Sequence, residues 1–321
     1  MSIPYFDLHC DTITGTLRKQ EGLRRNTLHL DLERLHRYAP CGQVFAVFTR
    51  PRGWKFSLGF DVPDCDYADL GPAFEHAFGH LLDELEKNSD IVRICGSAAD
   101  CRAAAAEGKI AALLAVEGAE QLDCSLEELR RVYDKGVRLV NLTWNYANAI
   151  CGSNQSGSGL TDYGREFVLE AQRMGVAIDL SHCSDAAFYD CMEIAEKPLL
   201  AGHSNARAIC AHPRNLTDDM FCALVKNSGV AGLNLYPLFL GEKADSELAF
   251  RHIEHFLALG GEKNVCLGTD YDGIENTPAD LTGVQDMGNL YECMLRHNYS
   301  EDLVRDIFYN NFMAYMEKAL S

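Results

Sequence analysis

Eight short apolar runs recur along the 321-residue chain, and a polar or glycine-containing turn and then a helical pattern follow each of them. Their hydrophobicity is nearly continuous, which is typical of parallel strands buried on both faces. Strands that alternate with helices eight times predict an α/β fold of the (β/α)8 TIM-barrel class, with a doubly wound open sheet as the alternative. The predicted strands are Ile3–Leu8, Gln43–Phe48, Ile110–Val116, Val137–Leu142, Val176–Leu180, Pro198–Ala201, Val230–Leu235 and Asn264–Leu267.

Three helices have clear sequence signals. The segment Ala73–Asn88 places its apolar side chains on one stripe, and Ser125–Lys135 opens with a Ser-x-x-Glu capping box. Thr161–Met174 begins at a threonine suited to cap a helix and ends before Gly175, a residue typical of helix C-termini. These signals support helices between the predicted strands.

The chain shows no internal repeat, low-complexity tract or linker, so we expect residues 1–321 to form a single barrel domain. The segment 49–90 is longer than a normal βα unit, which predicts an excursion between the second and third strands. A chain of this length buries most of its apolar surface without a disulfide or metal staple.

Charge and composition exclude several classes of partner. The chain has 29 basic and 47 acidic side chains, and its net charge of −18 argues against a nucleic-acid partner. No apolar run reaches the ~18 residues of a membrane span, and neither end carries a signal or anchor pattern. The 13 cysteines include no CxxC pair, which suits reduced, buried thiols. We therefore expect a cytoplasmic protein without a membrane anchor.

Histidine and carboxylate side chains gather where the predicted strands end. The carboxyl ends of barrel strands converge on one mouth, where barrel enzymes carry their active sites. Burying several acids together costs several kcal/mol unless a cation compensates them. The residues at five of these strand ends are His9, Asp11, Glu117, His182, His203 and Asp270.

These donors indicate a metal site. Histidine and carboxylate ligands without thiolates fit Zn²⁺ or a similar divalent ion, and their number suits two ions that share a bridging carboxylate. Such a pair generates hydroxide near neutral pH and polarises a carbonyl or phosphoryl group. The residues therefore predict a hydrolase.

The motifs that carry these residues follow one another across almost the whole chain. In this order they resemble the membrane (renal) dipeptidase family, the M19 zinc peptidases of the amidohydrolase superfamily. The resemblance implies a (β/α)8 barrel of the metallo-dependent hydrolase type. The motifs are His9-x-Asp11, Val116-Glu117-Gly118, Asp179-Leu-Ser-His182, His203-Ser204 with Arg214-Asn215, and Gly268-Thr-Asp270-Tyr-Asp272-Gly273.

The same resemblance implies a ligand set for two Zn²⁺ ions. One ion is held by His9 and Asp11, the other by His182 and His203, and Glu117 bridges both. A hydroxide that bridges the metals then attacks the amide carbonyl of a dipeptide.

The resemblance also implies two residues that act on the substrate. Asp270 shuttles the proton to the leaving amine, and Arg214 binds the free carboxylate of the dipeptide. A dipeptide or a similar small molecule is thus the expected partner. The sequence leaves open whether the chain forms a homodimer.

One position departs from the family pattern. The dipeptidases have Leu-Thr-His after the fourth strand, and this histidine helps to bind the substrate carbonyl, whereas this chain has Trp144. An indole donates one N–H but has no protonated form, so hydrolysis stands while the substrate stays open. The alternatives are another amidohydrolase acting on an N-acyl amino acid, lactone or phosphoester, and a non-catalytic, metal-stabilised binding barrel. The candidate substrate contacts are Trp144, Asn145, Tyr146 and Tyr236.

Overall fold

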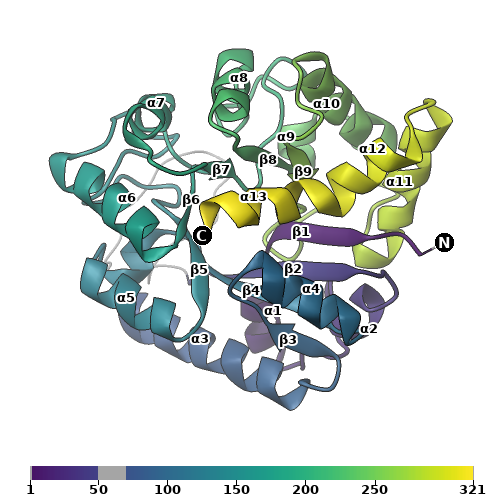
Figure 1. Cartoon of the computed structure of the whole chain (residues 1–321), viewed down its shortest axis with the longest axis horizontal. Helices are drawn as coiled ribbons and strands as arrows, with labels where there is room; N and C mark the ends of the chain where they lie inside the picture. Colours follow the sequence, from purple (N-terminus) through teal and green to yellow (C-terminus); the bar gives the residue numbers. More distant parts are fainter. Residues whose placement is uncertain (1, 50–69, 321) are drawn as a thin grey trace.

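The computed structural model describes residues 2–49 and 70–320. In this part of the chain, nine parallel strands form one sheet, shown in Figure 1. The strands are β1 (Tyr5–Cys10), β2 (Cys41–Val47), β3 (Val92–Ile94), β4 (Ile110–Val116), β5 (Val137–Asn141), β6 (Ala177–Asp179), β7 (Leu200–Ala201), β8 (Val230–Leu233) and β9 (Val265–Leu267).

The sheet closes into a barrel. The strand order is β2-β1-β9-β8-β7-β6-β5-β4-β3, and β2 also pairs with β4 from Gly42↔Ala111 to Val47↔Val116. The eight strands other than β3 therefore form a closed ring, and β9 joins β1 at Asp7↔Leu267. The predicted (β/α)8 barrel is confirmed, and the open-sheet alternative is wrong.

Strand β3, which lies outside the closed ring of eight, has no counterpart among the predicted strands. It pairs with the first residues of β4, from Val92↔Ile110 to Ile94↔Ala112, whereas β5 pairs with β4 from Leu114 onward. Its three residues lie at the edge of the barrel, and Ile94 is 40% exposed. A strand this short and this exposed has no continuous apolar run to mark it.

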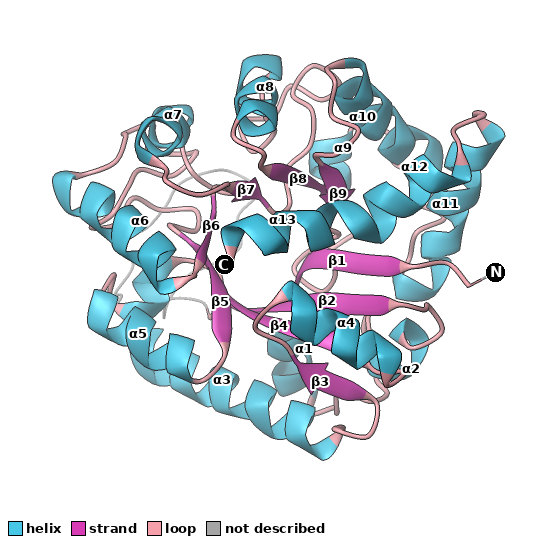
Figure 2. Ribbon diagram, viewed as in Figure 1, coloured by secondary structure: helices cyan, strands magenta, loops and turns pink. Residues whose placement is uncertain are grey.

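Helices surround the barrel on the outside, as Figure 2 shows. The serine and threonine caps predicted at Ser125 and Thr161 are confirmed, since each side chain accepts a backbone N–H three residues later, and Gly175 has the expected positive φ of 83°. The helices are α1 (Thr12–Lys19), α2 (Leu32–Leu35), α3 (Leu70–Lys87), α4 (Ala98–Ala106), η2 (Ala119–Leu122), α5 (Leu126–Asp134), α6 (Asp162–Met174), α7 (Asp185–Ile194), α8 (Asp218–Lys226), α9 (Pro237–Leu240), α10 (Ser246–Ala258), η3 (Val284–Asp286), α11 (Met287–Arg296), α12 (Glu301–Arg305), η4 (Asp306–Asn310) and α13 (Asn311–Ala319).

The predicted excursion at 49–90 overlaps residues 50–69, which lie outside the described residues. The described remainder of this segment forms α3, whose buried face includes Phe74, Phe78 and Leu81. This is the apolar stripe expected from the sequence.

The apolar core has two parts. One lies between the strands and the surrounding helices, and the other fills the barrel, whose N-terminal end is covered by α13. Strand β4 contributes to both, because Leu114 and Val116 belong to the first part and Leu113 and Ala115 to the second. Since side chains alternate along a strand, the next residue of the second set, Glu117, also faces the barrel interior.

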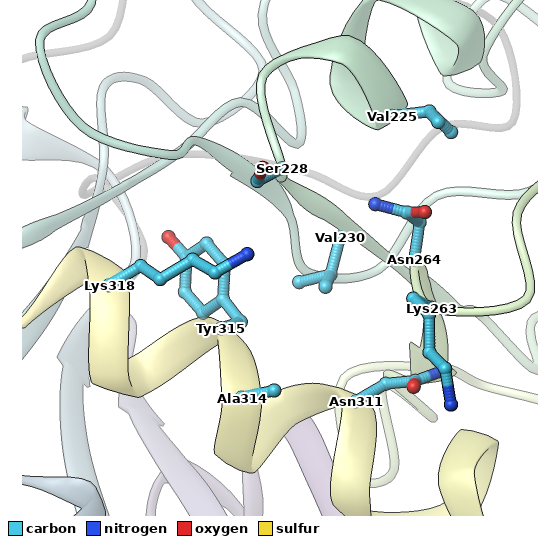
Figure 3. A pocket seen from close by; sticks show the side chains of 9 residues that line it. All are labelled: Val225, Ser228, Val230, Lys263, Asn264, Asn311, Ala314, Tyr315 and Lys318. Atoms are coloured by element: carbon cyan, nitrogen blue, oxygen red, sulfur yellow. The ribbon is translucent and has the colours of Figure 1, made fainter.

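A cavity of about 280 Å³ lies under this covering helix, between α13 and the first residues of β8 and β9 (Figure 3). Two of its polar side chains bind backbone carbonyl groups: Asn264 donates to Gly229 O, and Asn311 donates to Glu262 O and Val265 O. The bonds of Asn311 tie α13 to the barrel, and the cavity lies at the end of the barrel opposite the predicted site.

The twelve cysteines that the structure describes are free, and ten of them are buried, as predicted. Within residues 2–49 and 70–320, no helix combines the length and the apolar character required to span a bilayer.

Candidate active site and metal centre

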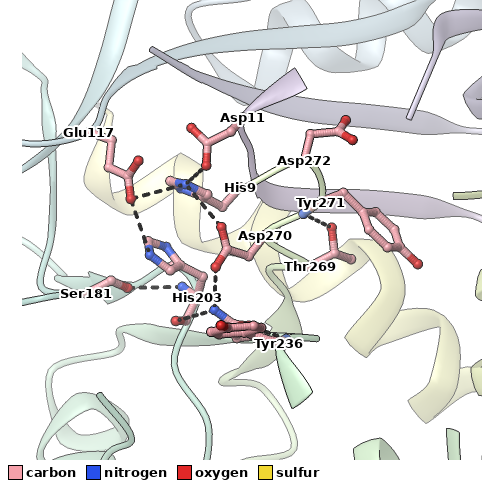
Figure 4. Close-up of polar contacts among 12 residues, drawn as sticks. His9, Asp11, Glu117, Ser181, His203, Tyr236, Thr269, Asp270, Tyr271 and Asp272 are labelled. Carbon is pink, nitrogen blue, oxygen red and sulfur yellow. Dashed lines mark hydrogen bonds and ion pairs between the residues drawn. The ribbon is translucent and has the colours of Figure 1, made fainter. Parts of the chain in front are cut away.

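The carboxyl ends of the barrel strands bring five of the predicted residues together in Figure 4, namely His9, Asp11, Glu117, His203 and Asp270, and the sixth, His182, lies against Glu117 and His203. His9, in β1, is at the centre of the first group. Its Nε2 atom lies 3.6 Å from Glu117 Oε1, 3.7 Å from Asp11 Oδ2 and 3.9 Å from Asp270 Oδ1. One imidazole nitrogen therefore faces three carboxylates from the ends of β1, β4 and β9.

A second group surrounds the same glutamate. Glu117 Oε1 lies 3.0 Å from His182 Nε2 and 3.7 Å from His203 Nε2, and these two nitrogens are 2.9 Å apart. Glu117 is thus shared, because one of its oxygens faces the Nε2 atoms of all three histidines.

The backbone at this mouth is strained at two of the predicted site residues. His182 and Asp270 each lie three residues past the ends of β6 and β9, and they have positive φ angles of 75° and 62°. Such left-handed residues cost on the order of 1–3 kcal/mol each, and they persist where the surrounding structure requires them. At Gly273, a Cβ atom would lie 2.1 Å from Asp11 Oδ2, so only glycine allows this loop to approach the ligand.

Two further buried carboxylates join neighbouring strand ends. Asp7 accepts hydrogen bonds from the backbone N–H and the hydroxyl of Thr269, at 2.8 and 2.6 Å. Asp179 accepts from the N–H groups of Ser181 and Gly202, at 2.8 and 2.9 Å. These bonds hold the segments that carry His9, His182, His203 and Asp270 at fixed separations.

Asn234 is a site residue that sequence reasoning missed. Its amide Nδ2 donates to Asp270 Oδ2 at 2.9 Å and to His203 O at 3.3 Å, and its Oδ1 accepts from Tyr236 N at 2.6 Å. One oxygen of Asp270 is therefore held, while the other faces His9. The sequence places Asn234 inside the predicted strand Val230–Leu235, whereas in the structure β8 ends at Leu233 and Asn234 directly follows it.

Without a cation, burial disfavours the charged forms of several side chains in these two groups. Burial, and then the charge of Asp11, raises the pKa of Glu117 to about 8, and burial raises the pKa of Asp270 to about 7. Burial also lowers the pKa of His182 and of His203 well below the usual value. Glu117, Asp270, His182 and His203 are thus driven toward their neutral forms, whereas at His9 the effect of burial is outweighed by Glu117 and Asp11, which raise its pKa well above the usual value. A bound divalent cation would favour ionised carboxylates and neutral imidazoles, the forms that bind a metal.

The donor atoms fit divalent metal ions. His9 Nε2 and Asp11 Oδ1 are buried and have no hydrogen-bond partner among the residues that the structure describes. Nitrogen and oxygen ligands at about 2.0–2.1 Å from a tetrahedral ion are about 3.3 Å from each other. The separations of 2.9 to 3.9 Å within the two groups are of this size. The site therefore offers buried, unpartnered nitrogen and oxygen donors at the spacing of metal ligands.

Comparison with known proteins agrees with this geometry. The sequence model of the membrane dipeptidase family, peptidase family M19, matches residues 1–320. The chain belongs to this family. This match confirms the family resemblance seen in the sequence motifs. The chain is therefore an enzyme of the metallo-dipeptidase type.

Individual relatives support the same assignment. A crystal structure of a metallo peptidase from Rhodobacter sphaeroides, liganded with a phosphinate mimic of the dipeptide L-Ala-D-Ala, has a TM-score of 0.90 and 29% identity, and the match covers 99% of this chain and 100% of that one. An uncharacterized protein encoded in the pqqA 5′ region of Klebsiella pneumoniae is 34% identical over 70% of this chain and 88% of its own length. An uncharacterized dipeptidase of Schizosaccharomyces pombe is 38% identical over 55% of this chain and 45% of its own length.

In this M19 chain, Arg214 lies buried beside the two groups of predicted ligands. Its Nε and Nη2 atoms have no hydrogen-bond partner in the described part of the chain. Burial lowers the pKa of Arg214, while the charges of Asp270 and Glu117 oppose that shift. Its guanidinium lies 5.4 Å from the ring centre of Phe239. A buried cation with unpartnered donors is suited to an anionic ligand.

Trp144, the departure from the family pattern, lies in an aromatic group beside His182. Its ring centre is 4.5 Å from Phe48, 5.5 Å from Tyr146 and 6.2 Å from His182. Its backbone N–H donates to Glu120 Oε1 at 2.9 Å. Tyr146 thus packs against Trp144, and the backbone N–H of Tyr236 donates to Asn234.

Asn145, predicted as a substrate contact, lies against His182, one of the predicted metal ligands. Its Oδ1 is 2.9 Å from His182 Nδ1, which makes it the acceptor for an Nδ1–H. In that tautomer the Nε2 lone pair points to Glu117 and His203. Such a partner orients a metal-binding histidine and raises its basicity.

We expect Asn145→Ala to lower the affinity for metal roughly 10- to 100-fold, because outer ligands of this kind contribute that much. Asn145→Asp is the matched control, since a carboxylate also accepts from His182 Nδ1–H. Metal content after dialysis against graded chelator measures the effect. If Asn145→Ala retains metal normally and loses only turnover, Asn145 contacts substrate instead.

Proposed function

We propose that this M19 chain is a binuclear zinc hydrolase that cleaves dipeptides. The observation that carries the proposal is the position of Glu117 between two ligand groups, His9 with Asp11 and His182 with His203. A carboxylate shared in this way suits two cations. The nitrogen and oxygen donors, without a thiolate, suit Zn²⁺.

When bound, two divalent cations supply a hydroxide nucleophile near neutral pH and polarise the scissile carbonyl. Asp270 accepts the proton from the nucleophile and returns it to the leaving amine. It is suited to this role because Asn234 holds its Oδ2 while Oδ1 faces the ligand group. The positive φ of Asp270 directs its carboxylate to this position.

Arg214 binds the free carboxylate of the dipeptide. Two parallel hydrogen bonds from a guanidinium match a carboxylate, and its Nε and Nη2 atoms lack other partners among the described residues. The Rhodobacter relative, which binds a phosphinate mimic of L-Ala-D-Ala, supports a dipeptide as substrate.

Metal removal tests this proposal. We expect the purified protein to carry two Zn²⁺ per chain, to lose dipeptide hydrolysis on dialysis against a chelator, and to regain it with added Zn²⁺. Elemental analysis combined with an assay over dipeptides of both stereochemical series measures both effects. Full hydrolysis by metal-free protein would contradict the proposal.

A second function class is favoured by one observation, the indole of Trp144 beside His182. Without the family histidine, the site would suit an N-acyl amino acid, a lactone or a phosphoester. A panel of these compounds beside dipeptides separates the two, since preference for a substrate without a free carboxylate leaves Arg214 without its proposed role. A non-catalytic barrel would instead gain thermal stability from metal and show no turnover with any of them.

We expect Arg214→Lys to lower kcat/KM for dipeptides roughly 10- to 100-fold, because one charge-assisted hydrogen bond contributes about 1.5–3 kcal/mol. The loss should appear mainly in KM, and hydrolysis of a C-terminally amidated dipeptide should change little. Arg165→Lys is the control, since Arg165 pairs with Asp190 at 3.1 Å on the outer helices. Equal losses on free and amidated substrates would refute the carboxylate contact.

A further inference from the structure

The outer layer of helices contains a second cluster of metal-binding side chains. α10 and α11 pack side by side (Figure 1), and between them lie Glu247, Cys293 and His297. One donor atom from each lies within 4.8 Å of the other two. We propose that this cluster binds a divalent metal ion through a thiolate, a carboxylate and an imidazole, separately from the active site.

The secondary structure places the three donors on one surface. Cys293 and His297 are four residues apart, at the end of α11 and at its C-cap, so they lie on the same face. Glu247 lies in the first turn of α10. An ion held by all three would link these two helices, which flank β9 in the chain.

The two oxygen atoms of the Glu247 carboxylate have different partners. Glu247 Oε2 lies 2.8 Å from His297 Nε2, while its Oε1 accepts from Arg296 Nη2 at 3.3 Å. Oε2 is therefore the oxygen available to an ion, and Arg296 orients the carboxylate from the other side, as outer partners of metal ligands do.

The imidazole and the thiol are also positioned in advance. The His297 ring stacks on Phe250, with ring centres 4.3 Å apart and an angle of 21° between planes. The Glu247 and His297 side chains are 51% and 43% exposed, whereas Cys293 is fully buried beneath them. An ion can thus enter from solvent between the two exposed groups and meet the sulfur below.

Metal binding at this cluster would release one proton from Cys293. The S–H bond of Cys293 breaks, a bond from sulfur to the metal forms, and the proton goes to solvent. The thiolate and the carboxylate together neutralise a divalent charge, and water completes a tetrahedral set. Burial raises the pKa of the Cys293 thiol to about 12, so the metal must displace this proton. A thiolate favours Zn²⁺, Co²⁺ or Cd²⁺ over Mg²⁺ and Ca²⁺.

Titration with Co²⁺ of protein that carries only the two Zn²⁺ ions of the proposed active site tests this third site. The proposed active-site ligands include no thiol, so a thiolate-to-cobalt charge-transfer band in the near ultraviolet reports on this cluster. We expect this band in the unaltered protein, its loss in Cys293→Ser, and at least roughly tenfold weaker Co²⁺ binding in His297→Ala. Cys222→Ser is the matched control, because Cys222 is a half-buried free cysteine on α8, and it should keep the band.

Two results would overturn the proposal. One is the absence of a thiolate band in the unaltered protein at saturating Co²⁺. The other is a band that persists in Cys293→Ser, which would assign it to another cysteine, such as Cys10 or Cys183 beside the active site. His297→Ala changes an exposed side chain, so it tests the site even if Cys293→Ser fails to fold. Neither result depends on peptidase turnover.

Discussion

Glu117→Gln is expected to lower kcat/KM for dipeptides by roughly 10³-fold or more and to lower the bound metal. A neutral amide of the same shape cannot serve as the anionic ligand that we propose two metal ions share between His9, His182 and His203. Metal-ion catalysis supplies several kcal/mol of charge stabilisation, and each ~1.4 kcal/mol is a factor of ten in rate. Steady-state kinetics and elemental analysis on the same preparation measure both effects.

Glu84→Gln is the matched control for this change. Glu84 is also a buried glutamate, but it lies on α3, where it accepts from Leu23 N at 2.7 Å and pairs with Lys87. We expect it to cost stability while metal content and kcat/KM stay within a few-fold of the unaltered protein. A Glu117→Gln enzyme with two metals and full turnover would refute the shared ligand.

Asp270→Asn is expected to lower kcat roughly 10²- to 10⁴-fold, the range typical of a lost general acid–base group. An amide of the same shape can still accept from Asn234 but cannot take up and return a proton. KM and metal content should change little, because Asp270 acts after the substrate is bound. Comparison of kcat, KM and bound metal in one preparation tests all three expectations.

Asp272→Asn separates this role from a general effect of charge at the same turn. Asp272 also has a positive φ, but in Figure 4 its carboxylate points away from the cluster, and it accepts from Thr12 Oγ1 and His29 N. We expect it to lose about 1–3 kcal/mol of stability and to keep kcat within a few-fold. Equal losses of kcat in the two variants would argue against a proton shuttle at Asp270.

Most of the barrel could be predicted because its signals are local. An apolar run such as Ile110–Val116 marks a buried strand by itself, and the structure has β4 with these same bounds. The missed strand β3 has three residues and one strongly exposed side chain, so nothing in its own sequence distinguishes it from a loop. The barrel closes by pairing β2 with β4, two strands far apart in the sequence, and no local sequence pattern predicts such a pairing.

The candidate site, like the barrel, could be predicted in part from local sequence signals. The sequence alone determined which residue types follow the strand ends, because the histidines and carboxylates come after apolar runs. The carboxyl ends of all the barrel strands lie at one mouth, so these residues are expected to lie together. Only the tertiary structure decided which atoms meet: that Glu117 faces three imidazoles, that Asn145 accepts from His182, and that Asn234 holds Asp270. The physical reason is that these pairs join different strands. Their separations depend on barrel closure and on left-handed turns at His182 and Asp270, which are set by the packing of the whole chain.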